Sequence, residues 1–317
     1  MTSIALQGTV ELGIIYAIMA LGVFLSFRIL NMPDLTVDGS FTLGAAISAL
    51  MCLKGSPWAG LPLAFLAGGL AGSVTALLHT KGRIQPLLSG ILVMLALYSI
   101  NLRVMGRANI PLINLPTVFS TWPWLNRWAE GYTALIGSSS LLVLILLLLF
   151  GFLKTRFGLV LRATGQNPQM VRSVGVNTDT TLTVGLALAN GLVALSGGLL
   201  AQYQLFADIS MGVGMVIVGL ASVIIGEGII GSHWLGQHLI AVTVGAVVYR
   251  LVIAMAMELG MPPTDLKLIS AVIVASALAA PALKEQWNLA KRQIQAQKGG
   301  GSEDAEDMEA DQKLPSG

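Results

Sequence analysis

The sequence predicts an all-α polytopic membrane protein with eight or nine transmembrane helices. Hydrophobic residues make up 55% of the chain, charged residues only 11%, and the mean hydropathy is +0.78. Soluble proteins carry about 25% charged residues, so the composition excludes a soluble globular fold. The apolar residues gather in runs of about 20, the length that an α-helix needs to cross the hydrocarbon layer. Since an open sheet edge cannot be satisfied in lipid, we expect every span to be helical.

Nine apolar segments are predicted to enter or cross the bilayer. They cover residues 9–30, 37–53, 59–79, 86–105, 133–153, 180–204, 211–227, 238–257 and 266–283. The second segment has a polar start, where Pro33 lacks a backbone donor and Gly39 and Ser40 open a new apolar run. We therefore expect a broken or re-entrant helix near residues 31–42. The alternative is a loop in which Asp34 or Asp38 caps the next helix.

Basic residues predict which ends of the spans face the cytoplasm. Three basic regions fall on one side of the membrane, and by the positive-inside rule that side is the cytoplasm. They hold Lys81 and Arg83, then Lys154, Arg156, Arg162 and Arg172, and finally Lys284, Lys291 and Arg292. The opposite face receives residues 105–132, where Trp122, Trp124 and Trp128 are typical of a membrane interface. The C-terminus is therefore expected inside, whereas the side of the N-terminus depends on whether residues 9–53 cross twice.

The chain is expected to consist of a transmembrane domain, residues 1–288, and a cytoplasmic polar tail, residues 289–317. The tail holds a cluster of acids between Glu303 and Asp311 and almost no apolar residues. It cannot bury enough surface to offset the entropy of ordering, so we predict that it is disordered. The basic balance of the remaining chain is explained by membrane topology, and we expect no nucleic-acid partner.

No residue pattern in the sequence predicts catalysis, a cofactor or a metal. A zinc site needs about four ligands, and His79, His233 and His238 have no acids or cysteines grouped with them at ligand spacing. The sequence contains no phosphate-binding loop of the Gly-x-x-x-x-Gly-Lys-Ser/Thr type. The single cysteine, Cys52, lies in an apolar run and cannot form an intrachain disulfide. We therefore expect no enzyme activity and no catalytic, cofactor-binding or metal-ligating residues on this chain.

Five polar residues within or beside the spans are candidates for a substrate path. They are Asn31, Asp34, Asp38, Asn101 and Asn190. Polar groups in the bilayer are costly and usually face a cavity or a partner. Broken helices in transporters also place free backbone groups near the substrate path. For Asn190, in the middle of a span, two interpretations stay open: a hydrogen bond to a neighbouring helix, or a place on the wall of a pore.

A polar segment, residues 162–177, separates two apolar spans. Pro168 opens a short helix that is predicted to end at Val174, with Gln166 or Asn167 as its cap. The helical spacing of three apolar residues predicts one small apolar face, formed by Met170, Val171 and Val174. Such a helix suits docking into a groove on a partner protein. The alternative is a helix that lies on the membrane surface.

Particular residues of this segment carry a resemblance to a known family. Arg162, Ala163, Asn167 and Met170, together with residues 175–177 and the small-residue stretch 196–201, resemble the coupling segment of ABC importer permeases of the branched-chain amino acid type. Residues 16–22 and the pair 31–32 match as well, so the resemblance covers residues 8–283. The string 31–41 departs from typical amino acid permeases and is closer to a subgroup associated with aromatic amino acid uptake.

The resemblance implies a permease subunit of an ATP-driven importer in the bacterial cytoplasmic (inner) membrane. It also implies ATP and Mg on separate nucleotide-binding subunits, an extracytoplasmic solute-binding protein, and a second copy of this chain in a homodimer. The residues that couple transport to the ATPase are then Arg162, Gly165, Asn167, Met170, Val171, Val174, Gly175 and Asn177.

The expected solute is small and polar, an amino acid in the first place and a nucleoside as the alternative. The competing class is an autonomous secondary transporter or channel. Such a protein needs intramembrane acids for ion coupling, and the sequence places few acids within its spans.

Overall fold

The computed structural model describes residues 3–121, 131–231 and 234–260, together with residues 268, 271–272 and 275–276. Nearly all of these belong to one compact unit, Met1–Ala271. Seven helices in this described part are long and apolar enough to cross a membrane. They are α1 (Ser3–Phe24, continued by the π-helix η1, Leu25–Ile29), α2 (Thr36–Leu53), α3 (Pro57–Thr80), α4 (Pro86–Met105), α6 (Thr133–Lys154), α9 (Thr178–Gln204) and α11 (Leu235–Glu258). The predicted all-α polytopic fold is confirmed.

Five shorter elements complete the described fold. α7 (Arg156–Gln166) and α8 (Pro168–Ser173) follow α6, and α10 (Met215–Ile230) precedes α11. The strands β1 (Asn109–Pro111) and β2 (Phe206–Asp208) form a small antiparallel pair. α10 takes the place of the predicted span 211–227, but it has only 16 residues. Its length of about 24 Å is less than the roughly 30 Å of the hydrocarbon layer.

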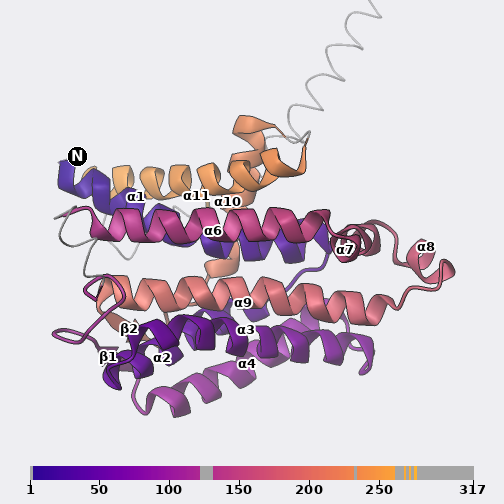
Figure 1. Cartoon of the computed structure of the whole chain (residues 1–317), viewed down its shortest axis with the longest axis horizontal. Helices are drawn as coiled ribbons and strands as arrows, with labels where there is room; N and C mark the ends of the chain where they lie inside the picture. Colours follow the sequence, from indigo (N-terminus) through magenta and orange to yellow (C-terminus); the bar gives the residue numbers. More distant parts are fainter. Residues whose placement is uncertain are drawn as a thin grey trace, which may run out of the picture. The chain divides into compact units, whose positions relative to one another are not determined.

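The long helices run alongside one another, so the bundle has two ends (Figure 1). At the first, which we call the sheet end, β1 pairs with β2, and Gln7 near the start of α1 donates a hydrogen bond to the carbonyl of Gly131. At the second, which we call the basic end, lie α7, α8 and the turn between α3 and α4. Arg83 and Arg172 line one cavity at this end, which agrees with the predicted grouping of the basic regions.

The N-terminal part of the chain crosses the bundle twice. α1 starts at the sheet end, and Arg28 in η1 reaches Glu227 near the end of α10, so this segment runs to the basic end. α2 then runs back to the sheet end. Trp58, in the first turn of α3, donates a hydrogen bond there to Thr121 in the loop that follows β1. Residues 9–53 therefore cross the bundle twice, which is the condition under which the N-terminus lies opposite the basic end.

The interior of the bundle is formed by α1, α2 and α9, whereas only 28% of the membrane-length stretches of α4 and of α6 is buried. Small residues bring the buried helices close together. A Cβ atom at Gly44 of α2 would collide with the carbonyl of Ala194, and one at Gly72 of α3 with the carbonyl of Leu186, both in α9. Close backbone approach at small residues is the usual mode of helix packing in membranes, as the many glycines predict.

The predicted helix break between the first two spans is confirmed. After η1, Asn31 adopts a left-handed conformation with φ of 52°, and Pro33 supplies no backbone donor. α2 begins at Thr36, whose backbone N–H donates to the Asp34 carboxylate at 2.9 Å. Leu35 is the N-cap residue of α2 and makes no side-chain cap hydrogen bond, so the Asp34 carboxylate supports the first residue of α2 without capping it.

Several predictions concern residues that the structure does not describe. The predicted span 266–283 lies almost entirely outside the described residues, as do Trp122, Trp124, Trp128 and His233. The domain boundary at residue 288 and the polar tail 289–317 also lie outside them. These predictions stand as the sequence leaves them.

Candidate functional site

The predicted short helix in the polar segment is present as α8. Asn167 caps it, since its side-chain oxygen accepts a hydrogen bond of 3.0 Å from the backbone N–H of Met170, and Pro168 occupies the first turn. α8 ends at Ser173, one residue earlier than predicted. The preceding α7 is capped in the same way by Thr155, which accepts from the N–H of Gly158. Both short helices are therefore fixed at their first turns by local hydrogen bonds.

The apolar residues of α8 and its end do not share one face, and that prediction is wrong in part. Met170 is 57% exposed and Val174 is 72% exposed, whereas Val171 is only 5% exposed. The reason is that Val171 points into the protein and anchors the helix. Met170 and Val174 alone remain available to a partner.

Residues at both ends of α8 hold the segment in place. Gly165, at the end of α7, packs so closely on η1 that a Cβ atom would collide with the carbonyl of Ile29. Gly175 has φ of 85°, a left-handed conformation that favours glycine, and it turns the chain toward α9. Asn177 then caps α9 by accepting from the backbone N–H groups of Asp179 and Thr180.

Arg172 ties α8 to the first turn of α9. Its Nε donates to the Thr178 hydroxyl at 2.6 Å, and its terminal nitrogen donates to the Asp179 carboxylate at 3.0 Å. Both carboxylate and guanidinium are well exposed, so this ion pair contributes little to stability by itself. Together with the bond to Thr178, it fixes the orientation of α8 relative to the first turn of α9.

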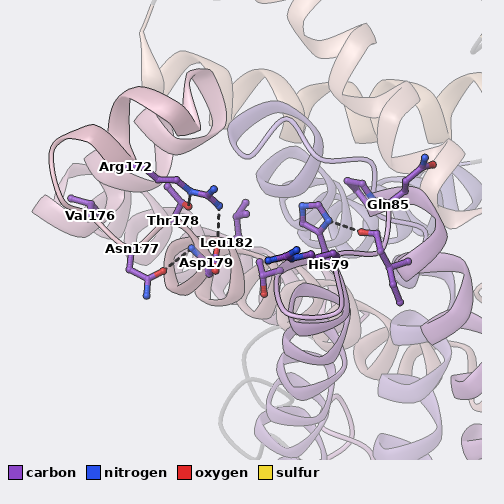
Figure 2. A pocket seen from close by; sticks show the side chains of 12 residues that line it. His79, Gln85, Arg172, Val176, Asn177, Thr178, Asp179 and Leu182 are labelled. Carbon is purple, nitrogen blue, oxygen red and sulfur yellow. Dashed lines mark hydrogen bonds and ion pairs between the residues drawn. The ribbon is translucent and has the colours of Figure 1, made fainter.

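A groove of about 730 Å³ separates this segment from the α3–α4 turn. We call it the basic-end groove. Figure 2 shows Arg172, Thr178 and Asp179 on one side of it and His79 and Gln85 on the other. The His79 ring lies 2.8 Å from the carbonyl of Ile84, which holds the turn closed. The sequence analysis did not include this turn in the site. The His79 to Ile84 contact lies within the turn, so no local signal places it beside α8 and α9.

Arg162 faces a second cavity at the basic end, of about 380 Å³. Arg28 and His238 also line this cavity. Both contact Glu227, with Arg28 Nε at 3.0 Å and His238 Nδ1 at 3.2 Å from the same carboxylate oxygen. Glu227 is therefore an acid near the end of α10 that joins this helix to η1 and α11.

Two of the predicted path residues, Asp34 and Asn190, meet in the interior of the bundle. The Asn190 amide donates to the Asp34 carboxylate at 2.6 Å and accepts from the Ser40 hydroxyl at 2.8 Å. Both side chains are fully buried. Asn190 thus makes the hydrogen bond to a neighbouring helix that one interpretation predicts. Ser40, and the Thr36 to Thr75 hydroxyl contact of 2.7 Å beside it, could not be recognised from sequence because short hydroxyls are common in packed helices.

The other predicted path residues lie apart from this pair. Asp38 accepts hydrogen bonds from the backbone N–H groups of Gly214 and Val216, at 2.9 and 3.0 Å, and so caps α10 from α2. Asn101 donates to the carbonyl of Gly39 at 3.1 Å. Asn31 is exposed in the break after η1. The structure thus brings together Asp34 and Asn190, places Asp38 and Asn101 in separate contacts, and leaves Asn31 exposed.

Two polar residues that the sequence analysis left without assigned roles also join helices. Glu11 of α1 accepts from the Tyr203 hydroxyl of α9 at 2.8 Å. The Arg250 guanidinium of α11 lies 4.5 Å from the centre of the Tyr16 ring of α1. The partner of Arg250 is therefore a ring face, which no charge pattern in the sequence could indicate.

Both a protein family and single known proteins are similar to this chain. A family model described as branched-chain amino acid transport system / permease component matches residues 6–278. The tyrosine transport system permease protein of Clostridioides difficile (strain R20291) is 42% identical, over 84% of this chain and 88% of that protein. No solved structure matches the chain significantly.

More distant relatives carry other solute names. The probable branched-chain amino acid transport permease protein LivH of Methanocaldococcus jannaschii is 24% identical, over 78% of this chain and 81% of that protein. The nucleoside ABC transporter permease protein NupC of Lactococcus lactis subsp. cremoris is 28% identical, over 60% of this chain and 65% of that protein.

Proposed function

The chain belongs to the family of permease components of branched-chain amino acid transport systems, and from this premise we propose how it takes part in transport. It is a transmembrane permease subunit of an ABC importer. Its solute is an amino acid, and the ATP and Mg that drive import bind to separate nucleotide-binding subunits. A solute-binding protein delivers the amino acid, and a second copy of the chain completes the transport path. The protein resides in the bacterial inner membrane, with its basic end in the cytoplasm.

The observation that carries this proposal is the exposed pair Met170 and Val174 on a short helix with fixed ends. A helix that passes on motion must be firmly joined to the membrane part, and Val171, Asn167 and Arg172 supply those joints. The exposed pair offers an apolar surface to a groove on an ATPase subunit, in the manner of other helix-in-groove contacts. Movement of that subunit then reaches α9, because Arg172 and Asn177 connect α8 to its first turn.

Charge supports the placement of the basic end in the cytoplasm. Lys81, Arg83, Arg162 and Arg172 all belong to the turn and the segment at this end. Positive residues in short loops favour the cytoplasmic side. The same side holds ATP, so the charge pattern and the docking helix point to the same location.

The proposed solute follows from the relatives and from charge. Two of the three relatives named above are amino acid transport proteins, and one of them is named for tyrosine. The nucleoside permease is matched over a smaller part of the chain, so a nucleoside remains the second candidate. An autonomous ion-coupled transporter is disfavoured, because the buried acids Asp34 and Glu11 and the half-buried Asp38 already bind partners in other elements.

Uptake into reconstituted vesicles tests the proposal. We expect the purified chain to move labelled tyrosine only when the nucleotide-binding subunits, the solute-binding protein and ATP are all present. An excess of unlabelled phenylalanine should compete, while an excess of adenosine should not. Uptake by the purified chain alone would contradict the proposal and favour the autonomous transporter. Competition by adenosine and not by phenylalanine would replace the amino acid with a nucleoside.

A further inference from the structure

A cavity of about 390 Å³ lies beside the first turn of α10 and is lined by β2 of the sheet end. We call it the sheet-end cavity. Its volume falls within the roughly 300–1,000 Å³ that is common for small-molecule sites. None of the five path residues predicted from the sequence lines it. It adjoins the point where α10 begins, and Asp38 of α2 holds that point through the backbone of Gly214 and Val216.

The inner part of the cavity is apolar and has a well-fixed aromatic ring. Tyr16 is only 6% exposed, its ring stacks on Phe41 with centroids 6.3 Å apart, and the Arg250 guanidinium covers it at 4.5 Å. Met211 and Met215 complete this part of the lining. The Tyr16 ring is thus held in place by Phe41 and Arg250, and the flexible thioethers of the two methionines adapt to a planar aromatic group.

The rim of the cavity carries one negative charge. Asp208 accepts hydrogen bonds from the hydroxyl and the backbone N–H of Ser210, and from the side-chain amide of Asn109 at 3.2 Å. The hydrogen bond from the Ser210 side chain lowers the pKa of Asp208 below its ordinary value, so the carboxylate stays ionised at neutral pH. An ammonium group at the rim would meet this carboxylate through a charge-assisted hydrogen bond.

We propose that the sheet-end cavity is a binding subsite for an amino acid with an aromatic side chain. The ring lies against Tyr16, Met211 and Met215, and the ammonium group faces Asp208. This inference rests on the proposed function, since it names where the chain itself contacts the solute. An acidic amino acid should bind more weakly, because its side-chain carboxylate would replace the aromatic ring against Met211 and Met215.

Protection of an engineered cysteine from alkylation tests this subsite directly. Cys52 is fully buried and is the single cysteine of the chain, so Cys52→Ala gives a background without native thiols. In that background we introduce Gln204→Cys, which lies on the cavity wall, or Ile113→Cys, which is 67% exposed and does not line the cavity. The purified full chain in detergent is then alkylated with a maleimide, with and without L-tyrosine or L-glutamate.

We expect saturating L-tyrosine to slow the alkylation of Gln204→Cys about tenfold, because only the unoccupied fraction reacts. Ile113→Cys should react at the same rate with or without tyrosine, and L-glutamate should protect neither position. Adding Asp208→Asn to the Gln204→Cys variant should remove most of the protection, measured as the ratio of the rates with and without tyrosine in that same variant.

Equal rates for Gln204→Cys with and without tyrosine would overturn the subsite. Protection that persists in the Asp208→Asn variant would overturn the role of the carboxylate. The assay needs neither ATP nor a partner, so it is independent of the uptake experiment. Tyrosine uptake without protection would refute the subsite alone, whereas protection without ATP-driven uptake would leave the subsite and refute the proposed function.

Discussion

At the scale of single residues, the polar side chains inside the bundle join helices to one another. Asp34 and Asn190 are both fully buried, and their 2.6 Å hydrogen bond connects the break before α2 with the middle of α9. A buried carboxylate is tolerated only when it is well hydrogen-bonded. Asn190 supplies one of the donors to this carboxylate, so its replacement has a predictable cost.

We predict that Asn190→Leu destabilises the protein by about 2–3 kcal/mol, because it removes one of the donors to a buried carboxylate, which then keeps the backbone N–H of Thr36. Asn101→Leu is the matched control. It removes a single hydrogen bond to the carbonyl of Gly39, and among the described residues the Asn101 side-chain oxygen has no partner to lose. Its expected cost is about 1 kcal/mol. Thermal unfolding in detergent measures both, and equal losses for the two variants would contradict the role given to Asn190.

At the scale of elements, the contact of α7 with η1 decides whether the docking helix is rigidly attached. Gly165 allows this contact, since any side chain there collides with the carbonyl of Ile29. We predict that Gly165→Ala loosens α7 and exposes the bond after Arg162 to trypsin. Gly151→Ala in α6 is the control, because nothing lies within 4 Å of a Cβ atom at that position. Limited proteolysis should cleave the first variant faster than the native chain and leave the second unchanged, and no difference between them would argue against this attachment.

The short helix α10 shows what local sequence cannot predict. The apolar run 211–227 has the composition of a span, yet α10 begins at Met215 and has 16 residues. Its start is set by Asp38, more than 170 positions earlier, whose carboxylate accepts from the backbone of Gly214 and Val216. A bond between such distant residues leaves no periodic pattern in either segment. By contrast, α4 runs from Pro86 to Met105 as predicted, because length, hydropathy and a proline at its start are all local signals.

The same distinction applies to α8. The cap at Asn167 and the start at Pro168 were predictable because they involve neighbours in the chain. The burial of Val171 was not, since it depends on packing against other helices. The sequence therefore predicted the helix and its cap, but not that its exposed apolar surface consists of Met170 and Val174 without Val171.

At the scale of the whole molecule, charge and hydropathy predicted the arrangement of the two ends. Arg83 and Arg172 line the same groove, as counting spans between basic loops requires. The sequence did not reveal the sheet-end cavity, because its lining comes from α1, α9, β2 and α10, and these meet only in the folded chain. The proposed solute subsite lies near one end of the bundle and α8, the proposed docking helix, at the other, with α9 between them.

The most direct test of this account is ATP-driven uptake by the complete importer with Asp in place of either exposed residue of the docking helix. We predict that Met170→Asp and Val174→Asp each reduce uptake about tenfold or more, because a carboxylate is then forced into an apolar groove. Both variants should unfold at the native temperature, since these side chains are 57% and 72% exposed. Ile113→Asp, at the sheet end and 67% exposed, should transport normally. Uptake at the native rate in both Met170→Asp and Val174→Asp would contradict the claim that α8 couples ATP hydrolysis to transport.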